Sequence, residues 1–362
     1  MQFSRTFYNI VTSYLSTENG MAMVTLNVLY QSDNNYSKYM GVSILSMLEN
    51  NKDAEDILVI IIDDRISQSI KDEISSIVKD RGRRLQWIDA DAIRENTIVS
   101  EWPKYEGFRK NTNCYLKYFI FDGMLDEGIE RVMYVDSDSV VLGSLGDLFT
   151  LDMQGKAIGM ARCCLVPRSY LESTGVGSDS PYFNAGMNLF DVKKWNEKQY
   201  SKKIIEAANT ERPFATVDQD LLNIVTRGDV IDIGCQYNYQ YMHVAYPHPV
   251  YLKHYKPLNY YSCKEVEDAT KDPKIVHFMR FLGENPWNER SNHPCAGMYD
   301  EYLSMTPWKG DKKPPSNKTA SFRVGRAMYK VLPRAVFLKI FKKYHERMLL
   351  KSDANAKRIV KK

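Results

Sequence analysis

The sequence predicts an α/β protein built on a parallel β-sheet of the nucleotide-binding kind. Two observations support this prediction. The chain has 362 residues, 44% of them hydrophobic and 26% charged, enough for one large or two ordinary globular domains. Over its first 135 residues, runs typical of buried strands alternate with segments whose apolar residues return at helical spacing. Such a βαβαβ order implies right-handed crossovers and a ligand site at the carboxyl ends of the strands.

The predicted elements of the N-terminal half follow this alternation in order. Residues 24–30 are a β-rich run, after which Met40, Ile44 and Leu48 return at helical spacing. The aliphatic run at residues 57–62 is typical of a buried strand and far shorter than the roughly 18 to 20 residues of a membrane span. Strands are expected at residues 24–30, 57–63, 85–88 and 131–135, and helices at 36–49, 66–78 and 115–125.

The second half has shorter, more mixed elements, typical of an α+β arrangement. The tyrosine-rich stretch at residues 237–261 is either a platform for an acceptor sugar or an irregular, packed part of the core. Prolines and glycine in residues 306–320 predict a linker rather than a helix. Strands are expected at 157–161 and 186–190, and helices at 192–208 and 219–225. The expected divisions are an N-terminal extension (1–22), a main domain (23–308), a linker (309–320) and a C-terminal tail (321–362).

Charge is strongly segregated along the chain. The formal net charge is only +4, from 49 Lys and Arg against 45 Asp and Glu, which does not indicate a nucleic-acid-binding protein. Residues 309–362 contain 17 Lys and Arg and 3 acidic residues, a net charge of +14, so the other 308 residues carry −10. The near-neutral total is therefore a cancellation between an acidic body and a basic tail.

The tail predicts two basic helices, a first at residues 322–332 and an amphipathic one after Pro333. The apolar residues of the second helix recur at helical spacing, whereas Lys339, Lys342, Lys343 and Arg347 lie off that stripe. Such a helix is typical of proteins that bind an anionic membrane surface, a role we expect for residues 321–351. The alternative is a helix that packs its apolar side on the main domain and leaves a basic face in solvent. Nucleic acid is not an expected partner, because no nucleic-acid-binding motif accompanies the charge. The apolar residues of the stripe are Val336, Phe337, Ile340, Phe341, Tyr344 and Met348.

The strand at residues 131–135 leads directly into Asp136 and Asp138. Carboxylates at the end of a buried strand repel each other and lose hydration unless a cation lies beside them. An Asp-x-Asp pair in an extended chain can present oxygens to one divalent ion, which keeps open positions for phosphate oxygens. The alternative is that Asp136 caps a turn and Asp138 is solvated. Asp63 and Asp64 also end a strand, and there a turn or N-cap role before the next helix is expected.

Five blocks of residues follow one another along the chain. They are Gln31-Ser32-Asp33-Asn34-Asn35-Tyr36, Tyr134-Val135-Asp136-Ser137-Asp138, Phe183-Asn184-Ala185-Gly186, Asp218-Gln219-Asp220, and His277-Phe278 shortly before Pro286-Trp287. In this order they resemble glycosyltransferase family 8, the retaining enzymes that include bacterial lipopolysaccharide glucosyl- and galactosyltransferases and the glycogenins. Five ordered blocks are far more specific than any one of them. The resemblance implies the glycosyltransferase A fold, a Rossmann-like domain with a mixed central sheet, as a catalytic domain over residues 23–308.

The resemblance also implies a role for each block. The first block would hold uracil and ribose, with Tyr36 stacking on the base. The Asp-x-Asp pair and His277 would bind Mn²⁺ or Mg²⁺, and mixed oxygen and imidazole ligands suit Mn²⁺. Gln219 would lie near the anomeric carbon, and Asp218 would hydrogen-bond hydroxyls of the donor sugar. The implied metal ligands are Asp136, Asp138 and His277; the catalytic residues are Gln219 and Asp218; the residues that contact the UDP-hexose are Gln31, Asp33, Asn35, Tyr36, Lys117, Asp136, Ser137, Asn184, Ala185, Arg280 and Gly283.

The chain departs from the family pattern at two cations. Lys117 stands where the family usually has an Arg, so the charge is kept but the bidentate fork is lost. Asn285 stands where the family has the Lys that clamps the diphosphate. Our hypothesis is that Arg280, the only cation between His277 and Trp287, replaces that Lys.

The resemblance implies a metal-dependent retaining glycosyltransferase that moves glucose or galactose from a UDP-sugar to a hydroxyl of a lipid-linked or cell-surface glycan, such as a lipopolysaccharide core or capsule. The N-terminal stretch lacks a secretory apolar region, so we expect a cytoplasmic enzyme held peripherally at the inner face of the membrane. Two alternatives stay open. The missing cations allow a catalytically impaired sugar-nucleotide-binding or scaffold protein, and the resemblance allows a soluble glycogenin-like glucosyltransferase, which the tail disfavours.

Overall fold

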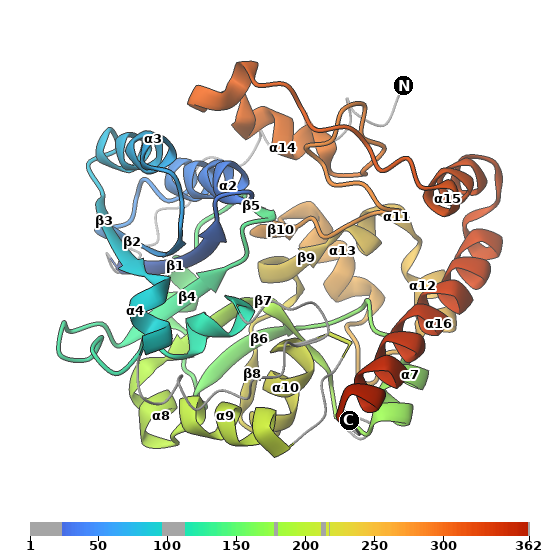
Figure 1. The fold of residues 1–362 in the computed structure, drawn as a ribbon, viewed down its shortest axis with the longest axis horizontal. Helices are drawn as coiled ribbons and strands as arrows, with labels where there is room; N and C mark the ends of the chain where they lie inside the picture. The colour runs from blue at the N-terminus through green and yellow to red at the C-terminus, as the bar shows by residue number, and fades with distance from the viewer. Residues whose placement is uncertain (1–23, 96–112, 177–179, 211–214, 217, 361–362) are drawn as a thin grey trace.

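The computed structural model describes residues 24–95, 113–176, 180–210, 215–216 and 218–360, and the side chains of residues 210 and 352–360 are not described. The expected N-terminal extension therefore lies outside the described residues. A mixed seven-stranded sheet runs through the molecule (Figure 1). Its strands, in spatial order, are β3 (Arg84–Asp89), β2 (Asp56–Asp64), β1 (Thr25–Asp33), β4 (Arg131–Val135), β7 (Phe183–Asp191), β6 (Ile158–Arg162) and β8 (Val230–Asp232).

The N-terminal half of this sheet is parallel, as the sequence predicted. Strands β3, β2, β1 and β4 all run in one direction, and β7 pairs antiparallel with both β4 and β6. The carboxyl ends of β1, β2 and β4 therefore meet at one edge, where the N-terminal end of β7 also lies, because Val135 pairs with Met187. The mixed α/β fold class predicted from the sequence is confirmed.

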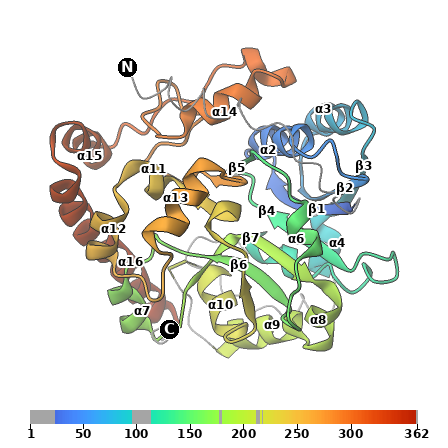
Figure 2. The same cartoon turned by 180° about the vertical axis from the view of Figure 1, so that it is seen from behind.

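Helices cover both faces of the sheet (Figures 1 and 2). The alternation along β2 shows why: Ile57, Val59 and Ile61 pack in one hydrophobic cluster with helices α2 and α3, and Leu58, Ile60 and Ile62 pack in the other. The first face carries α2 (Ser37–Glu49) and α3 (Gln68–Lys79), and the second carries α4 (Ala90–Glu95), α8 (Val192–Glu197), α9 (Tyr200–Thr210) and α10 (Asp218–Val225).

A small second sheet completes the edge at which the parallel strands end. Strand β10 (Ile275–His277) lies between β5 (Ser139–Val141) and β9 (Tyr239–Gln240), antiparallel to the first and parallel to the second. The shorter elements around it are η1 (Asn113–Tyr118), α6 (Gly146–Thr150), α7 (Arg168–Thr174), η2 (Cys235–Asn238), α11 (Tyr241–Ala245), α12 (His248–Tyr255), α13 (Cys263–Lys271), α14 (Ala296–Leu303) and η3 (Pro307–Gly310).

Two helices form the C-terminal part, α15 (Ala320–Val331) and α16 (Arg334–Val360), and they run along one side of the body (Figure 1). Phe337 of α16 is buried, with its ring stacked on Tyr246 at a centroid distance of 6.3 Å. The expected apolar stripe is divided. Phe337 and Phe341 pack on the body, whereas Val336, Ile340, Tyr344 and Met348 remain exposed. No helix among the described residues is both long enough and apolar enough to cross a membrane.

Two expected helices differ in the structure, and part of the expected linker packs on the main domain. The helix expected at 115–125 is only the 3₁₀ helix η1, followed by turns that end at Gly128, whose φ is +76°. The helix expected at 192–208 is two helices, α8 and α9, separated by Gln199 with φ of +55°. Residues 306–310 of the expected linker are anchored, because the buried Trp308 donates a hydrogen bond of 2.6 Å to Glu73 of α3.

The tyrosine-rich stretch at residues 237–261 supports the packed-core alternative. Its chain forms η2, β9, α11 and α12 in close succession. The aromatic side chains pack in the main hydrophobic cluster, where Tyr246 stacks on Phe337 of α16, so they do not form an open platform. The buried members are Tyr237, Tyr239, Tyr241, Tyr246, Tyr251, Tyr255 and Tyr261.

Candidate active site

The two aspartates of the Asp-x-Asp segment occupy the junction between the two sheets. Strand β4 ends at Val135, Asp136 follows it, and Asp138 immediately precedes β5. The neighbouring strand β10 pairs His277 with Ser139 in an antiparallel register. This register brings His277 beside the carboxylates although it lies 139 residues further along the chain than Asp138.

Asp136, Asp138 and His277 form a group of the size that one metal ion requires. One ligand atom from each lies within 4.8 Å of the other two. The His277 Nε2 atom is 3.2 Å from Asp138 Oδ1 and 3.6 Å from Asp136 Oδ2. Two carboxylates and one imidazole are a donor set that fits a divalent ion such as Mn²⁺ and leaves positions for other ligands. The residues present therefore fit the metal that the sequence implies.

Burial and neighbouring charges shift the pKa of each of the three groups. Burial raises the pKa of Asp136, and the nearby charges of Lys117 and His277 oppose that rise only in part. Burial acts on Asp138 in the same sense, but the charge and hydrogen bond of His277 outweigh it and lower the pKa of this carboxyl. Burial would lower the pKa of His277, yet the two aspartates raise it. The site thus attracts positive charge between its carboxylates.

A chain of side-chain amides connects His277 to the fourth block of the sequence. The Nδ1 atom of His277 lies 3.2 Å from Asn238 Oδ1, and the Asn238 amide donates to Asn184 Oδ1 at 2.8 Å. The Asn184 amide in turn donates to Gln219 Oε1 at 2.8 Å. A proton on Nδ1, donated to Asn238, leaves Nε2 free to face the carboxylates, as a metal ligand requires.

Asn238 was not among the residues selected from the sequence. It lies at the end of η2, inside the tyrosine-rich stretch, and is buried. Its neighbours in sequence are aromatic, so the local pattern reports core packing rather than a site. A polar Asn among aromatic residues is the one signal in the sequence, because a buried Asn needs hydrogen-bond partners. The sequence does not say which residues those partners are.

Gly186 of β7 lies directly against the metal-ligand group. A Cβ atom at this position would lie 2.3 Å from His277 Cε1 and 2.7 Å from Asp136 Oδ2. Its carbonyl oxygen accepts a hydrogen bond of 2.9 Å from the Asp136 N–H. The strand must come this close to hold Asp136, and only glycine leaves room for the ligands.

The Gln219 carboxamide has a single orientation fixed by its neighbours. Its Oε1 accepts from Asn184 and from the Ala185 N–H, at 2.8 and 3.2 Å, and its Nε2 donates to the Tyr182 hydroxyl at 3.0 Å. Tyr182 donates in turn to the buried carboxylate of Asp220 at 2.6 Å. Asp220 also accepts a hydrogen bond of 2.7 Å from Tyr170. This buried aspartate therefore positions the tyrosine that holds Gln219.

Lys117 holds Asp218 in the interior beneath the site. Its ammonium group lies 3.0 Å from Asp218 Oδ2 and 4.1 Å from the centre of the Tyr134 ring, and the Lys117 side chain is only 3% exposed. Burial lowers the pKa of Lys117, but the charges of Asp218 and Asp136 outweigh burial and raise it. The ammonium also donates to the Ala185 carbonyl at 3.3 Å. Lys117 therefore places a positive charge beside Asp218, and its replacement of the family's Arg stays a prediction.

The first block forms a turn between β1 and α2. The Asp33 carboxylate accepts from the N–H groups of Asn35 and Tyr36, each at 3.0 Å, and so shapes the turn itself. The Ser137 hydroxyl donates to the Gln31 carbonyl at 2.9 Å and ties this turn to the Asp-x-Asp segment. The first block and the Asp-x-Asp segment are therefore neighbours in space.

Arg280 and Gly283 lie on the loop that follows β10. Arg280 is exposed, and its guanidinium lies 3.5 Å from the Tyr36 hydroxyl, which places it at the edge of the first block. Gly283 has φ of +78°, and a Cβ atom there would lie 2.6 Å from the Phe322 ring of α15. The close approach of α15 explains why a glycine stands at position 283. A contact of Gly283 with UDP remains a prediction.

The other carboxylate pair, Asp63 and Asp64, has the turn role expected for it. The Asp63 carboxylate accepts from the Ile66 N–H at 2.7 Å. Asp64 pairs with Arg94 at 2.8 Å. These carboxylates are satisfied by the chain and do not form a second metal group with a third ligand among the described residues.

A mixed sheet of this order, with an Asp-x-Asp-His group at the ends of its parallel strands, is the arrangement of a glycosyltransferase of the A fold. The structure of an active-site mutant of LgtC superimposes with a TM-score of 0.61 at 20% sequence identity and covers 79% of this chain and 99% of LgtC. The particular family follows from the sequence: the profile of glycosyl transferase family 8 matches residues 27–291, and the chain belongs to this family.

Named relatives agree with this assignment. General stress protein A of Bacillus subtilis is 25% identical over 296 residues, which are 81% of this chain and 98% of that protein. A lipopolysaccharide 1,2-glucosyltransferase of Escherichia coli K12 is 23% identical over 305 residues, 82% of this chain and 83% of the relative. The protein is therefore a glycosyltransferase, and helices α15 and α16 lie beyond the region that the family profile matches.

Proposed function

We propose that this glycosyltransferase transfers glucose or galactose from a UDP-sugar to a hydroxyl of a lipid-linked or cell-surface glycan, such as a lipopolysaccharide core or a capsule, with retention of configuration. The observation that carries the proposal is the continuous connection from Asp136, Asp138 and His277 through Asn184 to Gln219. It joins a metal-ligand group and a candidate sugar-binding group by hydrogen bonds. The lipopolysaccharide glucosyltransferase of E. coli among the relatives supports the acceptor class.

Residues at the turn after β1 would receive the nucleotide. Gln31 Oε1 is buried and meets no donor among the described residues, so an N–H group of a bound base would satisfy it. Tyr36 would stack on the base, and Asp33 and Asn35 would contact the ribose. Arg280, next to the Tyr36 hydroxyl, would contribute positive charge toward the diphosphate.

Asp136, Asp138 and His277 would hold Mn²⁺ or Mg²⁺. When bound, the ion supplies positive charge that stabilises the UDP leaving group. His277 contributes its Nε2 because Asn238 occupies its Nδ1. Asp136 must be ionised to bind an ion, which a cation favours despite the burial of this carboxyl.

Gln219 and Asp218 would position the sugar. The ion pair with Lys117 occupies one Asp218 oxygen, which leaves the carboxylate suited to accept hydrogen bonds from sugar hydroxyls. Gln219 would lie beside the anomeric carbon, fixed by Asn184 and Tyr182. The acceptor hydroxyl attacks on the face from which UDP leaves, and the departing phosphate takes its proton. The rate then comes from positioning rather than from a strong nucleophile.

The test of the transfer reaction is UDP release. Purified protein with Mn²⁺ and a panel of UDP-hexoses is expected to release UDP slowly by hydrolysis and faster with a suitable acceptor. A chelator and Asp138→Asn are each expected to abolish release. No release with any donor, together with UDP binding by Asp136→Ala as tight as that of the unaltered protein, would contradict the proposal and indicate a scaffold protein.

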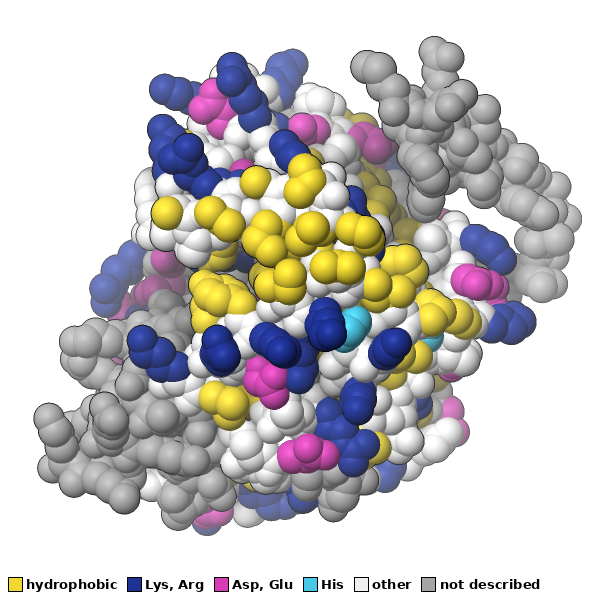
Figure 3. Space-filling view, turned by 90° about the vertical axis from the view of Figure 1, so that its right-hand side faces the viewer, with side chains coloured by type: hydrophobic (Ala, Val, Ile, Leu, Met, Phe, Trp, Pro, Cys, Tyr) yellow, Lys and Arg dark blue, Asp and Glu magenta, His cyan; other side chains and the backbone are white. Residues whose placement is uncertain are grey.

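We further propose that the α15–α16 face docks on an anionic membrane surface, which places the enzyme at the cytoplasmic side of the membrane. Six of the eight large hydrophobic side chains that are exposed among the described residues lie on these two helices. Figure 3 shows hydrophobic side chains gathered on this side of the molecule, with Lys and Arg beside them. The six are Val324, Val331, Val336, Ile340, Tyr344 and Met348, with exposed fractions from 42% to 78%.

The spacing of side chains on α16 suits this role. Val336, Ile340, Tyr344 and Met348 recur every four residues and form one exposed row. A second exposed row, also at intervals of four, consists of Lys339, Lys343, Arg347 and Lys351. An apolar row beside a basic row is complementary to the acyl boundary and the phosphate groups of an anionic bilayer.

A further inference from the structure

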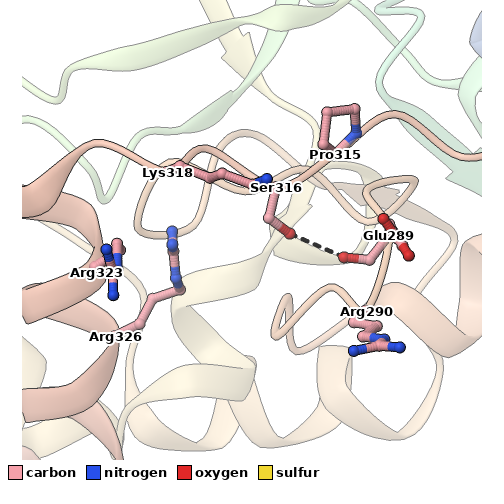
Figure 4. Close-up of a pocket in the computed structure, with 7 residues that line it drawn as sticks. All are labelled: Glu289, Arg290, Pro315, Ser316, Lys318, Arg323 and Arg326. Carbon is pink, nitrogen blue, oxygen red and sulfur yellow. Dashed lines mark hydrogen bonds between the residues drawn. The ribbon is translucent and has the colours of Figure 1, made fainter.

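A basic cavity lies where the loop after β10, the 314–318 segment and helix α15 meet. Its volume is about 450 Å³, within the range of small-ligand sites. Figure 4 shows Lys318, Arg323 and Arg326 on one side of it and Glu289 and Arg290 on the other. The lining residues are Glu289, Arg290, Pro315, Ser316, Lys318, Arg323 and Arg326. We call this cavity the α15 pocket.

Arg326 is part of the wall rather than a free charge. Its guanidinium donates to the carbonyl oxygens of Leu282 and Asn317 at 3.0 and 2.7 Å. Its Nε lies 3.5 Å from the carboxylate of Glu284, which is 2% exposed. These contacts hold α15 against both the loop and the 314–318 segment.

The remaining charges of the pocket are not balanced. Arg290, Lys318 and Arg323 form no ion pair with a described carboxylate, and neither does the Glu289 side chain. The 314–318 segment is fixed nearby by the Ser316 hydroxyl, which donates to the Glu289 carbonyl at 2.9 Å (Figure 4). Three cations against one carboxylate leave a charge of about +2, close to the opposite of a phosphate group at neutral pH.

Helix α15 adds to this potential. It begins at Ala320, its first turn carries no acidic residue, and its N-cap Thr319 makes no side-chain cap hydrogen bond. The positive end of the helix dipole is therefore uncompensated beside the unpaired cations. Arg290, Lys318 and Arg323 are exposed, so water screens their mutual repulsion, and an anion placed among them would be attracted by all three.

We propose that the α15 pocket is a binding site for a phosphate group, separate from the Asp136-Asp138-His277 site. The group belongs either to a free phosphorylated molecule or to the headgroup of an anionic phospholipid, and the chemistry that recognises it is the same. A ligand here would link α15 to the loop that carries Arg280. The proposal does not depend on the transfer reaction, because no residue of this pocket belongs to the site described above.

The test compares variants of the full chain that remove one charge each. Arg323→Gln and Lys318→Gln alter the pocket, and Lys330→Gln removes a charge from an exposed residue of the same helix outside it. Inorganic phosphate is titrated by calorimetry at constant ionic strength. We expect saturable binding that each pocket variant weakens at least tenfold and that Lys330→Gln leaves unchanged. Phosphate bound at the metal-ligand group is common to all variants and cancels in the comparison.

A second arm identifies the source of the phosphate. Phosphatidylcholine vesicles with and without phosphatidylglycerol are sedimented with the same proteins. If the pocket variants weaken vesicle binding more than Lys330→Gln does, the ligand is a lipid headgroup; if they weaken only binding of inorganic phosphate, it is a free phosphorylated molecule. The proposal is overturned if Lys318→Gln and Arg323→Gln behave like Lys330→Gln in both arms. Failure of UDP release would leave these readouts unaffected.

Discussion

At the scale of single residues, Tyr182 determines which atom of Gln219 faces the Asn184 amide. The Tyr182 hydroxyl accepts from Gln219 Nε2 and donates to Asp220, so the carboxamide oxygen is directed at Asn184 and Ala185. Without that acceptor the amide could rotate by half a turn and present the wrong group to the sugar.

We expect Tyr182→Phe to lower kcat about tenfold, the loss of one hydrogen bond of about 1.4 kcal/mol, with little change in KM for the donor. Tyr170→Phe is the matched control, because Tyr170 also donates to Asp220, whereas the Gln219 carboxamide donates to Tyr182. Steady-state kinetics measure both. Equal reductions of kcat in the two variants would mean that Asp220 acts only on folding.

Lys117 supplies the positive charge that balances the Asp218 carboxylate beneath the site. Asp218 is 16% exposed and Lys117 3% exposed, so removal of the ammonium leaves a carboxylate with little solvent to replace it. We expect Lys117→Met to lower the free energy of unfolding by about 3 kcal/mol, as measured by urea denaturation. Asp218→Asn in the same chain should recover part of this loss. Unchanged stability of Lys117→Met would show that the pair is not energetically important.

At the scale of elements, strand β7 lies so close to β10 and the Asp-x-Asp segment that its sequence is restricted at one position. We expect Gly186→Ala to weaken Mn²⁺ binding by roughly 10- to 100-fold, because the added methyl group must displace His277 or Asp136. Calorimetric titration with Mn²⁺ measures this directly.

Gly297→Ala on α14 is the control for Gly186→Ala. A Cβ atom at Gly297 meets no atom within 4 Å, so an added methyl group there should leave both folding and Mn²⁺ binding unchanged. Equal Mn²⁺ affinities of the two variants would contradict the assignment of the metal to Asp136, Asp138 and His277.

At the scale of the whole molecule, the enzyme joins a basic C-terminal tail to an acidic remainder. Residues 309–362 carry a net charge of +14, and the other residues carry −10. Removal of the tail would uncover Tyr246 and Tyr255, which α16 covers, so substitutions test its role better than truncation does. The exposed basic row of α16 can be altered without touching the packed face.

We expect the combined change of Lys339, Lys343 and Arg347 to Gln to weaken sedimentation with phosphatidylglycerol vesicles by about 100-fold, at roughly 1 kcal/mol for each basic residue. High salt should weaken binding of the unaltered protein in the same way. The same number of charges removed from exposed lysines of α8 and α9 should have no effect. That control consists of Lys193, Lys202 and Lys203 changed to Gln. Equal binding by both variants would refute docking through α16.

Local sequence patterns predict the parallel βαβαβ half, the placement of Asp136 and Asp138 after a buried strand, and the basic character of the tail. Each of these depends on local information: a hydrophobic period, a strand end and a count of charges. The family resemblance added His277 and Gln219. These residues lie far from the aspartates along the chain, so local patterns do not connect them.

Which side chains meet depends on how the elements pack in the folded chain. Asn238 and Tyr182 belong to the site because the strand order places η2 and β7 beside β10 and α10, and neither lies in a pattern that distinguishes it from core. The apolar stripe of α16 was correctly located, yet its division into a packed row and an exposed row depends on the surface of α12 against which the helix lies. A periodic pattern specifies that a side chain leaves water, whereas its partner is specified by contacts between residues far apart in the chain.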